Sequence, residues 1–166
     1  MRHGPTFVIT AAVGLIVSAG PCLAGVADPL AALKALYGAY QSSPADTASR
    51  NNLDTLYLWA DRQLKRKMLA NGICKIPLGK REVVCKLAND PVGGGSTADV
   101  GPAVVTQVAG NTTERRLTVV FPDGDGASHE IIFRFARSGR EWELTTCEGT
   151  TPLGGSWSLS EIIGDG

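Results

Sequence analysis

The alternation of apolar and polar residues between positions 103 and 147 constrains the fold of this chain more than any other feature. Four strand-length runs follow one another there, and each is bounded by residues that favour turns. In the second run, Leu117, Val119 and Phe121 fall on one side of an extended chain, so this side can be buried while the other faces water. Short connections make successive strands antiparallel neighbours. We therefore predict an antiparallel β-meander.

The third and fourth runs continue the same pattern. Ile131, Phe133 and Phe135 share one side of the third run. The fourth run alternates two sets of three residues, which are Trp142, Leu144 and Thr146 on one side and Glu143, Thr145 and Cys147 on the other. The inward-facing sets of the second and third runs are apolar and contain no acidic residue.

Two helical regions precede the meander. The first is predicted to begin at Pro29, with Asp28 as its N-cap, because a first helical residue does not need the amide that proline lacks. It ends before Pro44, which disfavours a helical conformation at the residue before it. The second region runs from about Asn52 to a stop at Asn71-Gly72.

Helices followed by a meander define an α+β class. We predict N-terminal helices packed on a bent antiparallel sheet of about four to six strands. The single domain spans residues 28–148, and a tail rich in glycine and serine occupies residues 149–166. The apolar residues of this tail either dock on the domain or leave it loose.

The N-terminus has the pattern of a secretory signal peptide. Arg2 precedes an apolar run at residues 7–17, and small residues follow it. Cleavage suits the position after Ala27 best, which makes residues 1–27 the signal peptide, and the position after Ala24 is the alternative. The run is too short for a stable membrane span, although an uncut N-terminal anchor is the other interpretation. We therefore expect a periplasmic or secreted protein.

The charge balance argues against nucleic acid as a partner. The chain carries 16 basic and 16 acidic side chains, whereas nucleic-acid-binding domains show a marked basic excess. The cluster Lys65-Arg66-Lys67 lies on a predicted helix, and we interpret it as a solvated face.

Three cysteines remain after signal cleavage, in a compartment that favours disulfides. A two-residue turn at Gly79-Lys80 would make a hairpin that places Cys74 opposite Cys85. We predict a disulfide between these two, with Cys147 pairing with one of them as the alternative. A metal site is not predicted, because the spacing lacks a Cys-x-x-Cys motif and His129 is the only histidine of the mature chain.

Three segments resemble the nuclear-transport-factor-2-like superfamily. They are residues 35–40 (Ala-Leu-Tyr-Gly-Ala-Tyr), 64–68 (Leu-Lys-Arg-Lys-Met) and 139–144 (Gly-Arg-Glu-Trp-Glu-Leu). The last is similar to the final strand of secreted bacterial members of unknown function, and the resemblance covers residues 28–148. It implies a cone-like fold, in which helices close the mouth of a strongly bent sheet around an internal pocket.

Some members of the superfamily are isomerases or dehydratases with Asp/His or Tyr/Asp sets in the cone. This chain departs from that pattern, because its inward-facing strand positions carry no acid. We predict no catalytic set and no cofactor. The residues expected to line a ligand pocket are the aromatics Tyr37, Tyr40, Trp59, Phe133, Phe135 and Trp142.

The sequence therefore favours a non-enzymatic binding module that holds a small apolar ligand in the cone or presents its sheet to an envelope protein. One alternative is a small lyase or isomerase that uses His129 with Tyr37 or Tyr40. Another is an envelope inhibitor or immunity protein.

Overall fold

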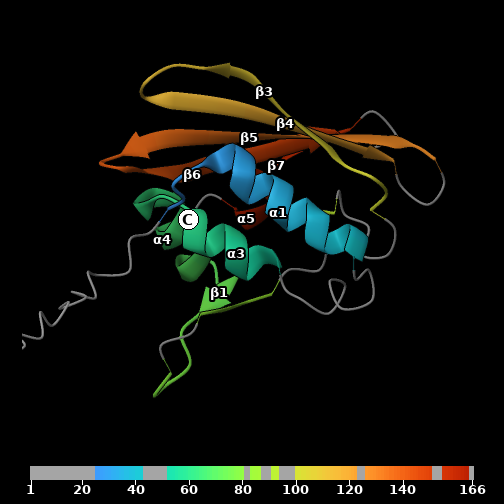
Figure 1. The fold of residues 1–166 in the computed structure, drawn as a ribbon. Coiled ribbons are helices and arrows are strands. Elements are labelled where there is room, and N and C mark those ends of the chain that lie inside the picture. The colour runs from blue at the N-terminus through green and yellow to red at the C-terminus, as the bar shows by residue number, and fades with distance from the viewer. Residues whose placement is uncertain are drawn as a thin grey trace, which may run out of the picture.

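The computed structural model of the protein describes residues 25–42, 52–80, 83–86, 91–93, 100–122, 126–150 and 155–164. Within these ranges the chain forms four helices, one five-stranded antiparallel sheet and one two-stranded hairpin, which confirms the α+β class. The helices lie on one side of the large sheet, and the small hairpin extends beyond them (Figure 1). The predicted signal segment up to residue 24 lies outside the described residues.

The large sheet is the predicted meander. Its strands, in their order in both chain and sheet, are β3 (Val104–Gly110), β4 (Glu114–Pro122), β5 (Ser128–Ser138), β6 (Glu141–Thr150) and β7 (Ser156–Ser158). The inner sides of the two central strands face the helices as expected, and every apolar residue predicted there is at most 1% exposed. The period-two pattern therefore identified the buried face of these strands correctly.

A bulge in β6 changes which residues enter the core. The register with β5 shifts after Arg134, so that Thr145 is an extra residue without an opposite partner on β5. Beyond this point Cys147 is buried and Thr146 is only half-buried. The prediction that Thr146 shares a side with Trp142 is wrong, because one bulged residue shifts the alternation of every later side chain.

A second bulge lies in β3 at the same level of the sheet. Its register with β4 shifts between Gln107 and Ala109, and Ala109 then pairs with Arg116. Arg116 in turn pairs with Arg134 on β5. Bulges increase the local twist of a sheet, so two of them flanking this row bend the sheet at one end.

The first helix has the predicted bounds. Helix α1 (Pro29–Ser42) begins with the backbone N–H of Leu30 donating to Oδ1 of Asp28 at 3.1 Å. Its inner side buries Leu33 and Tyr37. The hydroxyl of Tyr37 donates to the carbonyl of Val92 at 2.8 Å, which ties the described segment 91–93 to the core.

The second helical region is two helices rather than one. Helix α3 (Asn52–Trp59) and helix α4 (Arg62–Ala70) are separated by Ala60 and Asp61. Asp61 separates the two helices because it is the N-cap of α4, where its carboxylate accepts a hydrogen bond from the N–H of Leu64 at 2.7 Å. Its own N–H donates to the carbonyl of Leu144 at 2.8 Å. Periodicity alone did not reveal this break, because the apolar face continues across it.

Strand β7 pairs only with the last three residues of β6, and other segments cover the outer edge of β6 before them. Val26 exchanges two backbone hydrogen bonds of 2.8 Å with Trp142, and Ala60 bridges to Leu144. Val26 itself is 9% exposed. The residues just before α1 are therefore part of the sheet.

The C-terminal tail docks on the domain. Helix α5 (Leu159–Ile163) starts with a capping box between Ser158 and Glu161, and it buries Leu159 and Ile163 in the core. Strand β7 lies beside β6, where Trp157 is opposite Gly149. A Cβ atom at Gly149 would lie 2.7 Å from the indole ring of Trp157, so only glycine allows this approach.

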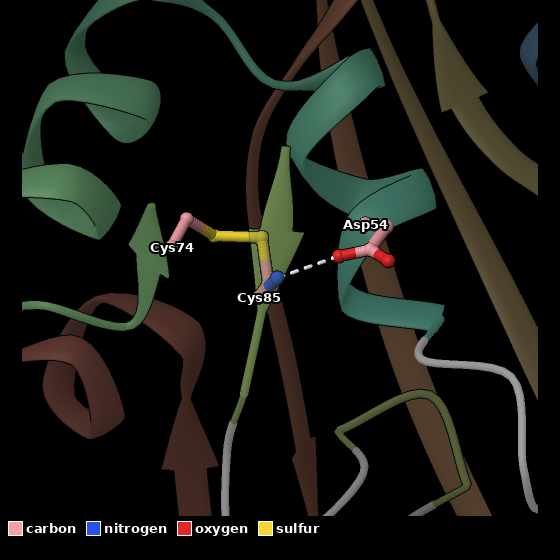
Figure 2. Close-up of a disulfide and its surroundings, with 3 residues drawn as sticks. All are labelled: Asp54, Cys74 and Cys85. Atoms are coloured by element: carbon pink, nitrogen blue, oxygen red, sulfur yellow. Dashed lines mark hydrogen bonds between the residues drawn. A yellow bond between two sulfur atoms is a disulfide. The ribbon is translucent and has the colours of Figure 1, made fainter. Parts of the chain in front are cut away.

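The cysteine hairpin forms with the predicted disulfide. Strands β1 (Cys74–Lys75) and β2 (Val84–Cys85) place Cys74 and Cys85 opposite each other, and their sulfur atoms are bonded (Figure 2). The backbone N–H of Cys85 donates to Oδ1 of Asp54 on α3 at 2.7 Å. Cys147 is a buried thiol outside this bond.

The turn of this hairpin is displaced by one residue from the predicted one. The N–H of Lys80 donates to the carbonyl of Pro77 at 3.0 Å, and the backbone of Gly79 has a φ of 77°. Leu78 and Gly79 are therefore the central residues, with glycine second rather than first. Glycine suits this second central position, because it adopts a positive φ without a steric penalty.

Two glycine-to-alanine substitutions test the role of the tail. Gly149→Ala forces the indole of Trp157 away and should lower the free energy of unfolding by about 1–3 kcal/mol. Gly38→Ala on α1, where no atom lies within 4 Å of the added Cβ, should instead raise it by up to about 1 kcal/mol. Urea unfolding of both variants measures the difference. Equal stabilities would contradict the close packing of β7 on β6.

Candidate functional site

Of the six predicted pocket aromatics, Tyr37, Phe133, Phe135 and Trp142 lie in the protein core, and Trp59 packs against it half-buried. Tyr37 contacts Phe133 edge to face, with ring centroids 6.4 Å apart, and Trp59 contacts Phe135 at 6.5 Å. Tyr37, Phe133 and Phe135 are at most 1% exposed. The structure therefore brings four of the six together as two packed pairs, while the side chain of Tyr40 lies outside the described part of the chain.

Trp142 stands apart from these pairs, between two arginines. The guanidinium carbon of Arg115 lies 4.4 Å from the centroid of the indole, and that of Arg137 lies 5.1 Å from it. Arg115 also pairs with the carboxylate of Asp28 at 3.3 Å. These contacts join the start of α1 to the sheet and are structural cation–π interactions.

His129 faces inward from β5. Its imidazole is 3% exposed and stacks on the ring of Phe121, with centroids 5.3 Å apart. Tyr37 lies on the same ring of Phe121, at 5.8 Å, and its hydroxyl is engaged by Val92. His129 and Tyr37, two of the three residues named in the lyase or isomerase hypothesis, thus both lie close to the ring of Phe121.

The feature with the geometry of a binding site lies on the opposite face of the sheet. A surface groove of about 480 Å³ occupies the bent end where the two bulges lie. It is lined by Ala109, Gly110, Asn111, Glu114, Arg115, Arg116, Arg134, Phe135, Ala136 and Thr145. No described helix covers this face (Figure 1).

Two arginines on neighbouring strands line the groove. Arg116 and Arg134 are directly opposite each other in the β4–β5 register. Like charges in opposite positions of a sheet repel, so this pair is unfavourable unless counter-charges are supplied. Arg134 has one, because its Nη2 lies 2.6 Å from Oε1 of Glu148.

Arg116 has no such partner among the described residues. Its Nε atom is buried and makes no hydrogen bond. A buried donor without an acceptor costs about 1–3 kcal/mol. The structure therefore tolerates an unsatisfied donor on an arginine that lines a groove open to solvent.

The chemistry that satisfies Arg116 is that of an anion. A guanidinium presents several N–H donors in a plane, which matches the two oxygens of a carboxylate. Glu114 lines the groove but makes no ion pair with Arg116. The alternation of the sequence placed Arg116 on the wet face of β4, but it did not predict that its Nε is buried.

The described residues contain no group of three or more histidine, cysteine or acidic side chains placed to hold a metal ion. Nor do they include a helix that is both long and apolar enough to cross a membrane. Comparison of the chain with protein-family models, curated proteins and solved structures yields no match.

Arg116→Met tests whether the guanidinium serves the fold. Because methionine keeps an apolar stem and removes the buried donor, the free energy of unfolding should stay the same or rise by about 1 kcal/mol. Arg134→Met, which breaks the pair with Glu148, should lower it by up to about 1 kcal/mol. Urea denaturation measures both. A marked loss of stability for Arg116→Met would mean that this residue is structural.

Proposed function

We propose that the protein is a secreted, non-enzymatic binding module that takes an anionic group of its ligand into the groove on the open face of the sheet. The observation that carries the proposal is the pairing of Arg116 with Arg134 in the groove, where only Arg134 has an acidic partner among the described residues. A carboxylate of an envelope protein partner, or of a small ligand, would supply a counter-charge to the half-buried Arg116. Proteins commonly retain such locally unfavourable groups where they serve binding.

Membership in the nuclear-transport-factor-2-like superfamily is part of this proposal, as is the cone-like shape. The support is the order of the elements, with helices preceding a meander, and the bend that two bulges introduce at the level of Arg116. In the described residues the helix-covered side of the sheet is filled by aromatic pairs. The open side, with its groove, is therefore the better-supported binding surface.

The alternative of a lyase or isomerase has weaker support. His129 and Tyr37 would have to act from positions that are at most 3% exposed, and the Tyr37 hydroxyl already donates to a backbone carbonyl. A general acid or base must reach the proton it transfers. Neither group lines the groove around Arg116.

Secretion is proposed with the mature chain beginning at Gly25 rather than Asp28. Cleavage after Ala24 retains Val26, whose two backbone hydrogen bonds cover the edge of β6 at Trp142. Cleavage after Ala27 would remove them and expose the edge. The carboxylate of Glu141 also lies beside Gly25, where a new α-ammonium group would be placed.

A titration with succinate tests the groove. NMR spectra of the ¹⁵N-labelled protein should show that the Nε–H resonance of Arg116 and the amides of Ala109 and Gly110 shift as the dicarboxylate is added. Arg116→Met should abolish these shifts. The matched control is Arg140→Met, which removes the same charge from an exposed turn outside the groove and should leave them intact. Identical titrations for the two variants would reject the groove as an anion site.

Intact mass of the protein recovered from the periplasm tests the N-terminus. A mass that begins at Gly25 and is reduced by two hydrogens for the disulfide is expected. A mass that begins at Asp28 would show that the Val26 pairing is not part of the mature protein. A full-length mass would reject secretion with cleavage altogether.

A further inference from the structure

The hairpin between Cys74 and Cys85 projects from the helices on the side away from the large sheet (Figure 1). The apolar residues Ile76, Pro77 and Leu78 lie at its tip, beside the turn glycine Gly79. Ile76 is 56% exposed and Leu78 is fully exposed, at 104%. A projecting tip of this kind contributes nothing to the core, so its apolar residues require another explanation.

The base of the hairpin is held rigidly. Both cysteines of the disulfide are at most 2% exposed, and the N–H of Cys85 donates to Asp54 on α3 (Figure 2). Next to it, the N–H of Lys86 donates to the carbonyl of Ile73 at 2.7 Å. The base of the hairpin is therefore anchored to the helices, and the tip extends from this base.

The surroundings of the tip are strongly basic. Residues 52–86 contain eight of the 16 basic side chains of the chain but only three of the 16 acidic ones, although the whole chain is neutral. Lys75, Lys80 and Lys86 are exposed on the hairpin itself. Of the three acids, Asp54 and Asp61 are used in backbone hydrogen bonds.

One nearby cation does not belong to this exposed basic surface. Lys65 donates to the carbonyl of Leu58 at 3.2 Å and lies over the ring of Tyr57. Burial lowers the pKa of its ammonium group, and the carboxylates of Glu143 and Asp61 partly oppose this effect. The free positive charge is thus concentrated on the hairpin lysines and on exposed residues of α4 such as Arg66.

Aliphatic residues flanked by lysines suit a lipid surface better than a protein surface. Protein interfaces draw their affinity mainly from tryptophan, tyrosine and arginine, and lysine is depleted in them. In the membrane interface, aliphatic side chains enter the acyl boundary while lysine stems extend toward the phosphates. Exposed lysines are also attracted to anionic lipids.

We propose that the hairpin docks the protein on the surface of an anionic phospholipid bilayer. Ile76 and Leu78 enter the interface, and Lys75 and Lys80 contact the phosphates around them. The proposal is independent of the groove. The hairpin lies beyond the helices on one side of the large sheet, and the groove lies on the sheet face that the helices do not cover (Figure 1). A protein docked in this way keeps the groove of Arg116 directed away from the lipid.

Vesicle co-sedimentation of the protein purified from the periplasm, and of its variants with the same N-terminus, tests the proposal. The vesicles are phosphatidylcholine alone and phosphatidylcholine with one quarter phosphatidylglycerol. The protein should bind the mixed vesicles more tightly, and added salt should weaken binding because it screens the lysines. Ile76→Ser with Leu78→Ser should weaken binding at least tenfold, and each of Lys75→Gln and Lys80→Gln should weaken it about fivefold.

The control is Val104→Ser, which removes an aliphatic residue that is 64% exposed on β3, away from the hairpin. This variant should bind the mixed vesicles as the unmodified protein does. Failure of the unmodified protein to bind them overturns the proposal, whether or not the hairpin binds another protein. Binding that survives the Ile76 and Leu78 substitutions also overturns it, because the lipid contact must then come from another segment.

Discussion

The apolar contact between the inner face of β4–β5 and the helices is the interaction on which the other elements depend. Leu117 and Phe133 lie at the centre of this contact and are completely buried. Because a sheet has two faces and the helices cover one, the same packing leaves the opposite face in water. The fold thus divides the molecule into a filled side and an open side, and the open side carries the groove.

The main elements of the fold could be predicted from the sequence, because their positions follow from local periodicity. Alternation identified the inner side of β4 and β5, and Asp28-Pro29 marked the start of α1. The facing positions of Cys74 and Cys85 followed from counting outward along a hairpin, and the register is correct although the turn itself is displaced by one residue. In each case neighbouring residues determine the outcome.

The features that the sequence did not reveal depend on partners distant in the chain. The extra residue Thr145 is defined only by its position against Arg134, and the break at Asp61 only by its bond to Leu144. The candidate site was missed for the same reason. In the sequence Arg116 looks like any exposed arginine, because its position opposite Arg134 depends on the register of β4 and β5. The basic surface of the hairpin is hidden by a net charge of zero.

The bulge at Val108 has a consequence beyond the bend that it produces. β3 is one of the two outer strands of the sheet, and it carries no charged side chain along its length. A straight outer strand of this composition offers an unbroken row of amides and carbonyls on which a second molecule could extend the sheet. The extra residue interrupts that row, so the kink that shapes the groove also protects the molecule against edge-to-edge aggregation.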